Sequence, residues 1–176
     1  FFHPHPAIPD PLWSRGLGDV YKRQIPNTVA NSVRKISNFN VALTTIHLNG
    51  GKDMIEAASS EKGNIKILGV SILTSLSEND IFEITHTEFD AYFNNLISIA
   101  SNTNVDGVVC SPNELDKLKN FNKLKVVPGI RNDISDDDQK RVMSPMEAYK
   151  KGADFIVVGR PITKSEDPRK ALELFL

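Results

Sequence analysis

Five short apolar segments alternate with helix-like segments over residues 25–176, and this alternation limits the fold more than any other feature of the sequence. A strand followed by a helix and then by another strand forms a parallel sheet with right-handed crossovers. The sequence therefore predicts an α/β fold built around a parallel sheet. The five predicted strands are residues 41–47, 66–72, 105–110, 123–127 and 155–158.

The helix-like segments show apolar residues at helical spacing and clear start signals. Residues 52–60 and 88–100 are predicted helices, with Thr87 as the N-cap of the second. Ser111 and Ser144 each precede a proline and, three residues later, a glutamate, which predicts a capped helix start. The predicted core residues of the first two helices are Met54, Ile55, Ala57, Ala58, Phe89, Phe93, Leu96, Ile97 and Ala100.

Composition excludes several functional classes. Hydrophobic residues make up 40% of the chain and charged residues 24%, as in ordinary globular proteins. The formal net charge of −1 provides no basic field for nucleic acid, and no apolar run reaches the roughly 20 residues that span a membrane. The single cysteine, Cys110, excludes an internal disulfide and a cysteine-cluster metal site, and it favours a cytoplasmic location.

Residues 1–24 have no apolar periodicity and fit neither a helix nor a strand. Residues 19–24 resemble the translation of an adapter used in DNA sequencing libraries. We therefore treat residues 1–24 as a non-native or disordered segment and residues 25–176 as the folded domain, with a natural disordered tail as the alternative.

Two strand ends carry a glycine followed closely by an arginine. Residues 155–158 read as a buried parallel strand, because their apolar run is uninterrupted, and Gly159 and Arg160 follow at once. Gly129 and Arg131 follow the preceding strand in the same way. Glycine lets backbone N–H groups approach a ligand, and two guanidinium groups on neighbouring strands suit one phosphate. For a single Gly-Arg pair, a solvated arginine after a strand is the alternative.

Three further polar residues lie near predicted strand ends. Thr74 follows the strand at 66–72 and suits either the polar edge of a ligand or a cap of the next helix, and the residues alone favour the cap. Gln139 lies in a polar loop after Arg131 and suits a ligand contact or a helix start. His47 has no second ligand at metal spacing, so we interpret it as a structural histidine.

Taken together, these residues resemble one family, the orotidine 5′-phosphate decarboxylases. The motifs occur in the same order as in the family and extend over residues 25–176. No single motif is specific for the family, but their combination is. The matching segments are residues 25–29, His47 with Gly50 and Gly51, and residues 73–75, 106–111, 128–131, 138–141 and 157–163.

The resemblance implies an incomplete (β/α)₈ TIM barrel of the ribulose-phosphate-binding type, with about five to six of eight βα units. It also implies a homodimer that converts orotidine 5′-monophosphate to UMP in pyrimidine biosynthesis without a metal or organic cofactor. By matched position, the substrate-binding residues would be Gly159, Arg160, Arg131 and Gln139 at the 5′-phosphate, Thr74 at the pyrimidine and Thr28 at the ribose of the partner subunit's site.

The catalytic motif of the resembled family, Asp-x-Lys-x-x-Asp, is not intact before Ile25. Asp19 coincides with the first aspartate, but Tyr21 occupies the lysine position and Gln24 the second aspartate position. Lys22 is one residue late, which on a strand turns the side chain to the opposite face. The first two strands of the family are also absent, so we expect this chain to be inactive.

Two other functions are also compatible with the sequence. Another phosphosugar-binding barrel, such as a hexulose-phosphate synthase or a keto-gulonate-phosphate decarboxylase, would share the fold and the phosphate contacts. A non-catalytic nucleotide-binding protein, or an unstable fragment with open sheet edges, is the second alternative.

Overall fold

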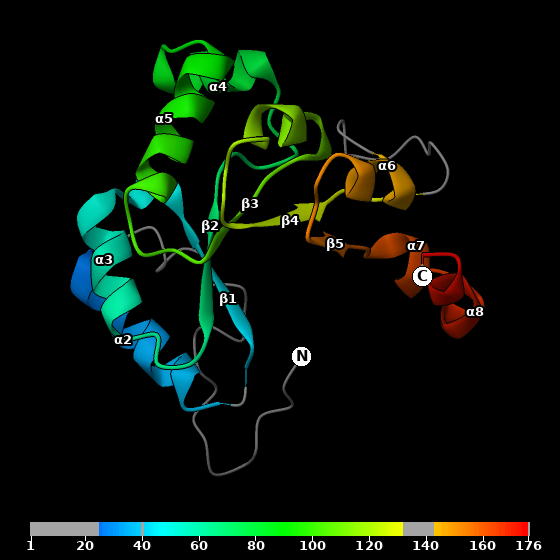
Figure 1. Ribbon diagram of the computed structural model, residues 1–176, viewed down its shortest axis with the longest axis horizontal. Coiled ribbons are helices and arrows are strands. Elements are labelled where there is room, and N and C mark those ends of the chain that lie inside the picture. Colours follow the sequence, from blue (N-terminus) through cyan, green and yellow to red (C-terminus); the bar gives the residue numbers. More distant parts are fainter. Residues whose placement is uncertain (1–24, 40, 132–142, 176) are drawn as a thin grey trace.

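The computed structural model describes residues 25–39, 41–131 and 143–175. Its five strands form one sheet in the order β1-β2-β3-β4-β5, and each neighbouring pair is parallel (Figure 1). The predicted α/β architecture is therefore confirmed, with each of the five expected strands present. The strands are β1 (Leu43–His47), β2 (Lys66–Val70), β3 (Gly107–Val109), β4 (Leu124–Pro128) and β5 (Phe155–Val157).

Helical segments connect the strands. The helix α3 (Lys52–Ser60) has the predicted bounds, and α5 (Phe89–Ser101) begins one residue later than predicted. Two helices, α2 (Pro26–Ser37) and α4 (Glu78–Thr85), were not predicted from the sequence. The remaining helical segments are η2 (Leu48–Gly50), η3 (Pro112–Leu118), α6 (Pro145–Lys150), α7 (Arg160–Thr163) and α8 (Pro168–Glu173).

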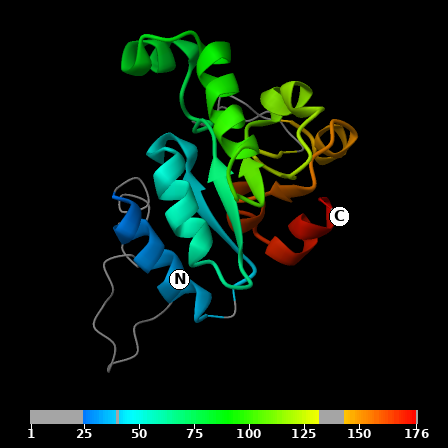
Figure 2. The ribbon, with the colours of Figure 1, turned by 60° about the vertical axis from the view of Figure 1, so that its left-hand side comes forward.

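The helix α2 begins with a proline at its first position, where the missing N–H costs nothing. Val29 and Val33, one helical turn apart, are fully buried, so this face of α2 points into the core. Figure 2 shows α2 and α3 packed next to each other on one face of the sheet. The helices α7 and α8 lie near β5, the last strand of the sheet.

Two aspartates form hydrogen bonds with the backbone of a neighbouring strand at the amino end of the sheet. Asp106, just before β3, accepts a hydrogen bond from the Ile67 N–H of β2 (2.8 Å) and pairs with the Lys62 ammonium (2.7 Å). Asp154, just before β5, accepts a hydrogen bond from the Lys125 N–H of β4 (2.7 Å). These contacts lie at the end of the sheet opposite the glycine-arginine pairs, so we assign them a structural role.

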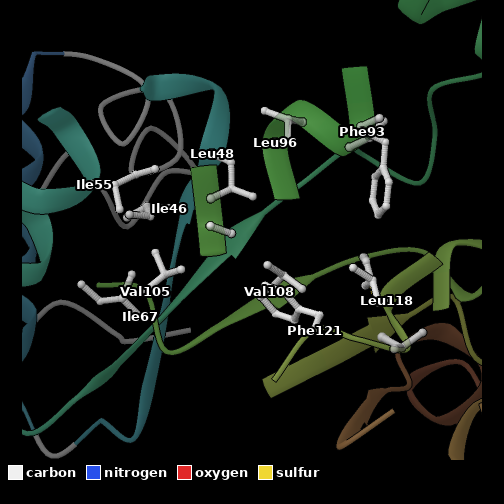
Figure 3. Packing of buried hydrophobic residues seen from close by; sticks show 14 of the residues in the cluster. Ile46, Leu48, Ile55, Ile67, Phe93, Leu96, Val105, Val108, Leu118 and Phe121 are labelled. Atoms are coloured by element: carbon white, nitrogen blue, oxygen red, sulfur yellow. The ribbon is translucent and has the colours of Figure 1, made fainter. Parts of the chain in front are cut away.

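The core is one cluster that extends from α2 to Phe175 and lies between the sheet and its helices (Figure 3). Phe93 and Leu96 of α5 are buried, as predicted, and so are Met54, Ile55 and Ala58 of α3. Ala57 and Ile97, also predicted as core, are only partly buried. Burial of this apolar surface is the main driving force for the fold.

Two predictions about local structure were wrong. The strand at Phe155 is not buried: Phe155 and Val157 share one face of β5 and are 50% and 49% exposed. The reason is position, because β5 is the last strand of the sheet and pairs only with β4. Thr87 is not the N-cap of α5, since Glu88 occupies that place and the Thr87 hydroxyl donates to the Thr85 carbonyl instead.

Gly107 marks the closest approach between β3 and β4. A Cβ at this position would lie 2.4 Å from the Leu124 carbonyl oxygen, which belongs to the backbone and cannot rotate away. We expect Gly107→Ala to destabilise the fold by about 2–3 kcal/mol, which lowers Tm by roughly 4–12 °C. Thermal melting followed by circular dichroism measures this change.

Gly50→Ala is the matched control, because its Cβ would meet the flexible end of the Met54 side chain. We expect its Tm to fall by less than half as much. Equal losses in the two variants would contradict the close β3–β4 approach.

Candidate functional site

Arg131 and Arg160 follow the carboxyl ends of two paired strands, β4 and β5. Pro128 of β4 pairs with Val157 of β5, and each arginine lies three residues beyond its member of that pair. Because the strands are parallel and adjacent, both arginines leave the sheet at its carboxyl edge. Ligands of parallel α/β sheets bind at this edge, and arginine side chains there suit an anion.

Arg131 is held in place by its own backbone. Its N–H donates to the Met143 carbonyl (3.0 Å), and the Met143 N–H donates to the Gly129 carbonyl (3.3 Å). Gly129 has a φ of 79°, a conformation that favours glycine. The Arg131 side chain is 8% exposed. Gln139, the other residue predicted here, lies outside the described residues.

Gly159 leaves open space where β5 turns into α7. A Cβ at this position would have no heavy atom within 4 Å among the described residues, so a ligand group has room beside the backbone. The Gly159 carbonyl accepts hydrogen bonds from the N–H groups of Ile162 and Thr163, both at 3.0 Å. These bonds begin α7 and place Arg160, which is half-buried, in its first turn.

Thr74 lies in a turn at the carboxyl end of β2 and is half-buried. The interpretation of Thr74 as a cap of the next helix is wrong, because Ser77 caps α4. The Ser77 side chain accepts a hydrogen bond from the Asp80 N–H (3.2 Å), and Asp80 accepts one from the Ser77 N–H (2.7 Å). The alternative interpretation, that Thr74 contacts the polar edge of a ligand, stays a prediction.

Ser71 is a polar residue at this edge that the sequence analysis missed. Its side chain is 6% exposed, and both its N–H and its hydroxyl donate to the Val109 carbonyl at 3.0 Å. This double contact fixes the end of β2 against β3 and thereby positions the turn that carries Thr74. The available signal was a lone serine within the apolar segment at 66–72.

Cys110 and Glu114 lie at the carboxyl end of β3 and are both buried. The Glu114 carboxylate accepts hydrogen bonds from the Ser111 N–H (2.9 Å) and hydroxyl (3.0 Å), as expected for the predicted capped start. Burial, reinforced by the nearby Glu114 carboxylate, raises the pKa of the Cys110 thiol to about 12. The thiol is therefore protonated at neutral pH and is no nucleophile.

Thr28 and His47 lie on the β1 side of the site. Thr28 is half-buried in the first turn of α2, and its carbonyl accepts a hydrogen bond from the Ser32 hydroxyl (2.9 Å). A short connection joins the end of α2 to the start of β1, so the beginning of α2 faces the carboxyl end of that strand. His47 ends β1 and is 7% exposed, which agrees with a structural histidine.

The comparison with known proteins fits this arrangement. A sequence model described as "Orotidine 5′-phosphate decarboxylase / HUMPS family" matches residues 24–175. Curated orotidine 5′-phosphate decarboxylases from Aquifex aeolicus and Ehrlichia chaffeensis are 44% and 41% identical over 162 residues. In both cases the match covers 88% of this chain and 70% of the relative. The chain belongs to the orotidine 5′-phosphate decarboxylase family.

Solved structures place the sheet within the fold of this family. The orotidine 5′-phosphate decarboxylase from Lactobacillus acidophilus superimposes with a TM-score of 0.74 at 33% identity, covering 86% of this chain and 69% of that one. The decarboxylase fold is a TIM barrel, and the five parallel strands described here form an incomplete one. Within the described residues, no helix is long and apolar enough to span a membrane.

Proposed function

We propose that this chain supplies the substrate-binding part of an enzyme that decarboxylates orotidine 5′-monophosphate to UMP in pyrimidine biosynthesis. The observation that supports the proposal is the register of β4 and β5, in which Pro128 pairs with Val157 and each strand is followed three residues later by an arginine, Arg131 or Arg160. Because the chain belongs to the orotidine 5′-phosphate decarboxylase family, we infer that the anion bound there is the phosphate of a nucleotide.

In this proposal, the Gly159 N–H and the Arg160 guanidinium bind the 5′-phosphate, with Arg131 and Gln139 completing that end of the site. Thr74 forms a hydrogen bond with the pyrimidine edge. Phosphate binding lies far from the reacting carbon, and its binding energy offsets the cost of orienting and distorting the substrate there.

We propose that Thr28 reaches the ribose in the active site of a partner subunit, so that the enzyme is a homodimer. Thr28 is half-buried in the first turn of α2, so part of it is accessible to a partner. A cytoplasmic location is part of the same proposal and is supported by the single, buried cysteine.

We further propose that the chain as given lacks the catalytic group. The window that would carry it contains Asp19, Tyr21 and Gln24, which lie outside the described residues. A tyrosine at the position of the catalytic lysine provides no fixed positive charge at neutral pH.

A phosphosugar-binding barrel is the second candidate, because the description of the matching family model also includes the HUMPS group. The curated relatives from Aquifex aeolicus and Ehrlichia chaffeensis are both orotidine 5′-phosphate decarboxylases, which favours the nucleotide enzyme.

Thermal melting with added ligands tests the proposal. We expect saturating UMP to raise Tm, because a ligand that binds only the folded state stabilises it by about 2.7 kcal/mol at a hundred times its Kd. A hexulose phosphate at the same concentration is the control and should have a much smaller effect. A larger shift with the sugar phosphate would favour the second candidate, and no shift with either would contradict both.

A further inference from the structure

Ser71, just beyond β2, binds a backbone acceptor that is itself held from the other side. Its N–H and its hydroxyl both donate to the Val109 carbonyl of β3 at 3.0 Å. The N–H of the same peptide unit belongs to Cys110 and donates to the Val126 carbonyl of β4 (3.2 Å). A single peptide unit therefore joins the end of β2 to β4, and the Ser71 hydroxyl adds a second bond to an acceptor that is already fixed.

The turn that carries Thr74 is anchored at both of its ends. At its start, Ser71 and Ile72 are both buried. At its end, Leu76 packs against the core, and its N–H donates to the Leu73 carbonyl (3.0 Å), which closes the turn. Thr74 lies between the two anchors, so the position of its backbone depends on both of them.

The Thr74 hydroxyl is placed almost entirely by the backbone of this turn. Within the part of the chain that the structure describes, the hydroxyl has no hydrogen-bond partner that would orient it. Only one side-chain torsion separates the hydroxyl from the backbone, so the turn decides which ligand atoms it can reach. Hydrogen bonds weaken steeply outside a narrow range of distance and angle, and a displacement of about 1 Å is enough to lose such a contact.

We propose that Ser71 is a positioning residue for base recognition, because its hydroxyl holds the turn where the Thr74 hydroxyl meets the pyrimidine. The inference rests on the proposed function for the role of Thr74. Its basis in the structure is the double contact with the Val109 carbonyl, one bond more than the backbone pairing of β2 and β3 supplies. The phosphate contacts proposed for Gly159 and Arg160 follow another strand, β5, and do not depend on this turn.

Hydrogen exchange on the full chain of 176 residues, without any ligand, is the first test. Ser71→Ala removes the hydroxyl and keeps the N–H bond to the Val109 carbonyl. We expect the Leu76 amide, which closes the turn, to exchange at least about fivefold faster than in the wild type. Unchanged exchange at the Leu76 amide would overturn the proposal, whether or not the chain binds a nucleotide.

Thr103→Val is the matched control for this measurement. Thr103 and Ser71 are each 6% exposed, and the Thr103 hydroxyl also donates to a backbone carbonyl, that of Ile99 (2.8 Å). Thr103 lies before β3, at the amino end of the sheet, so its loss should leave exchange at the Leu76 amide as in the wild type. An equal acceleration in both variants would indicate a general loss of stability and would overturn the proposal.

Calorimetry with UMP and with ribose 5-phosphate is the second test, because ribose 5-phosphate keeps the phosphate and lacks the base. We expect Ser71→Ala to weaken UMP binding about three- to tenfold, the effect of one net hydrogen bond, and to leave ribose 5-phosphate binding unchanged. Ser71→Thr keeps the hydroxyl and suits a strand end, so it should restore UMP binding. Equal losses for the two ligands would overturn the proposal. If Ser71→Thr fails to fold, Ser71→Ala decides alone.

Thr74→Val separates this inference from the proposed function. We expect it to weaken UMP binding only, and adding Ser71→Ala to it should weaken UMP binding no further, because Ser71 acts through Thr74. Additive losses would overturn the positioning role and leave the proposed function intact. UMP binding by Thr74→Val that equals the wild type would contradict the pyrimidine contact of the proposed function, and this proposal with it.

Discussion

Purified chain is expected to convert no orotidine 5′-monophosphate above a blank. Loss of CO₂ leaves a carbanion on the pyrimidine ring, which a fixed ammonium group must stabilise and then protonate. Tyr21 stands at the lysine position of the motif, and a phenol group carries no positive charge in either protonation state. The fall in absorbance as substrate is consumed measures the rate.

The full-length relative from Aquifex aeolicus is the positive control for this assay, because it is 44% identical over the shared region. Turnover by this chain that grows in proportion to its concentration and disappears in Arg160→Ala would contradict the expectation. Such turnover would mean that other residues supply the charge.

Arg160→Ala is expected to weaken UMP binding by a hundredfold or more. Arg160 follows Gly159 at the end of β5, where a guanidinium group and a backbone N–H can converge on one phosphate. A charge-assisted hydrogen bond contributes roughly 1.5–3 kcal/mol, so a two-bond contact reaches about 3–5 kcal/mol before desolvation is subtracted. Each 1.4 kcal/mol corresponds to about tenfold in Kd, and isothermal calorimetry measures the change.

Arg160→Lys and uridine are the controls for this effect. The lysine keeps the charge but not the planar fork, so it should recover only part of the lost affinity. Uridine has no phosphate and should bind wild type and Arg160→Ala about equally. An equal loss for uridine and UMP would show that Arg160 holds the fold or the base, and the phosphate assignment would be wrong.

The parallel direction of the strands was predictable from the sequence, because strands that alternate with helices form parallel sheets. Their order along the sheet was implied only by the resemblance to a barrel family. Bounds were predictable where apolar spacing and flanking residues agreed, as in α3 (Lys52–Ser60). The helix α4 was missed because its capping box uses Asp80 in place of the usual glutamate, and only Ile81 of α4 is buried.

Burial of β5 was not predictable from its own residues. Phe155 and Val157 have the composition of a core strand, but their exposure depends on whether another strand lies beside them. The apolar pattern of β5 indicates a strand that suits burial on both faces. Among the described residues, however, β5 has a neighbouring strand on one side only. The difference between the predicted burial of β5 and its observed exposure therefore has a clear physical cause.

The candidate site was partly predictable. The Gly-Arg pairs and Thr74 were visible as polar residues after apolar strands, and parallel topology placed them at one edge. The equal offset of Arg131 and Arg160 required the register of β4 and β5, which the sequence does not state. Ser71 was missed because its hydroxyl binds a carbonyl of the neighbouring strand, a contact between residues far apart in sequence.

A crystal structure of the chain with UMP would show whether the carboxyl edge from β2 to β5 is a single nucleotide site. We expect the phosphate within hydrogen-bond distance of the Gly159 N–H and the Arg160 guanidinium, with the pyrimidine near Thr74. A phosphate bound elsewhere, or UMP bound with its base at Arg160, would show that this edge is not the nucleotide site.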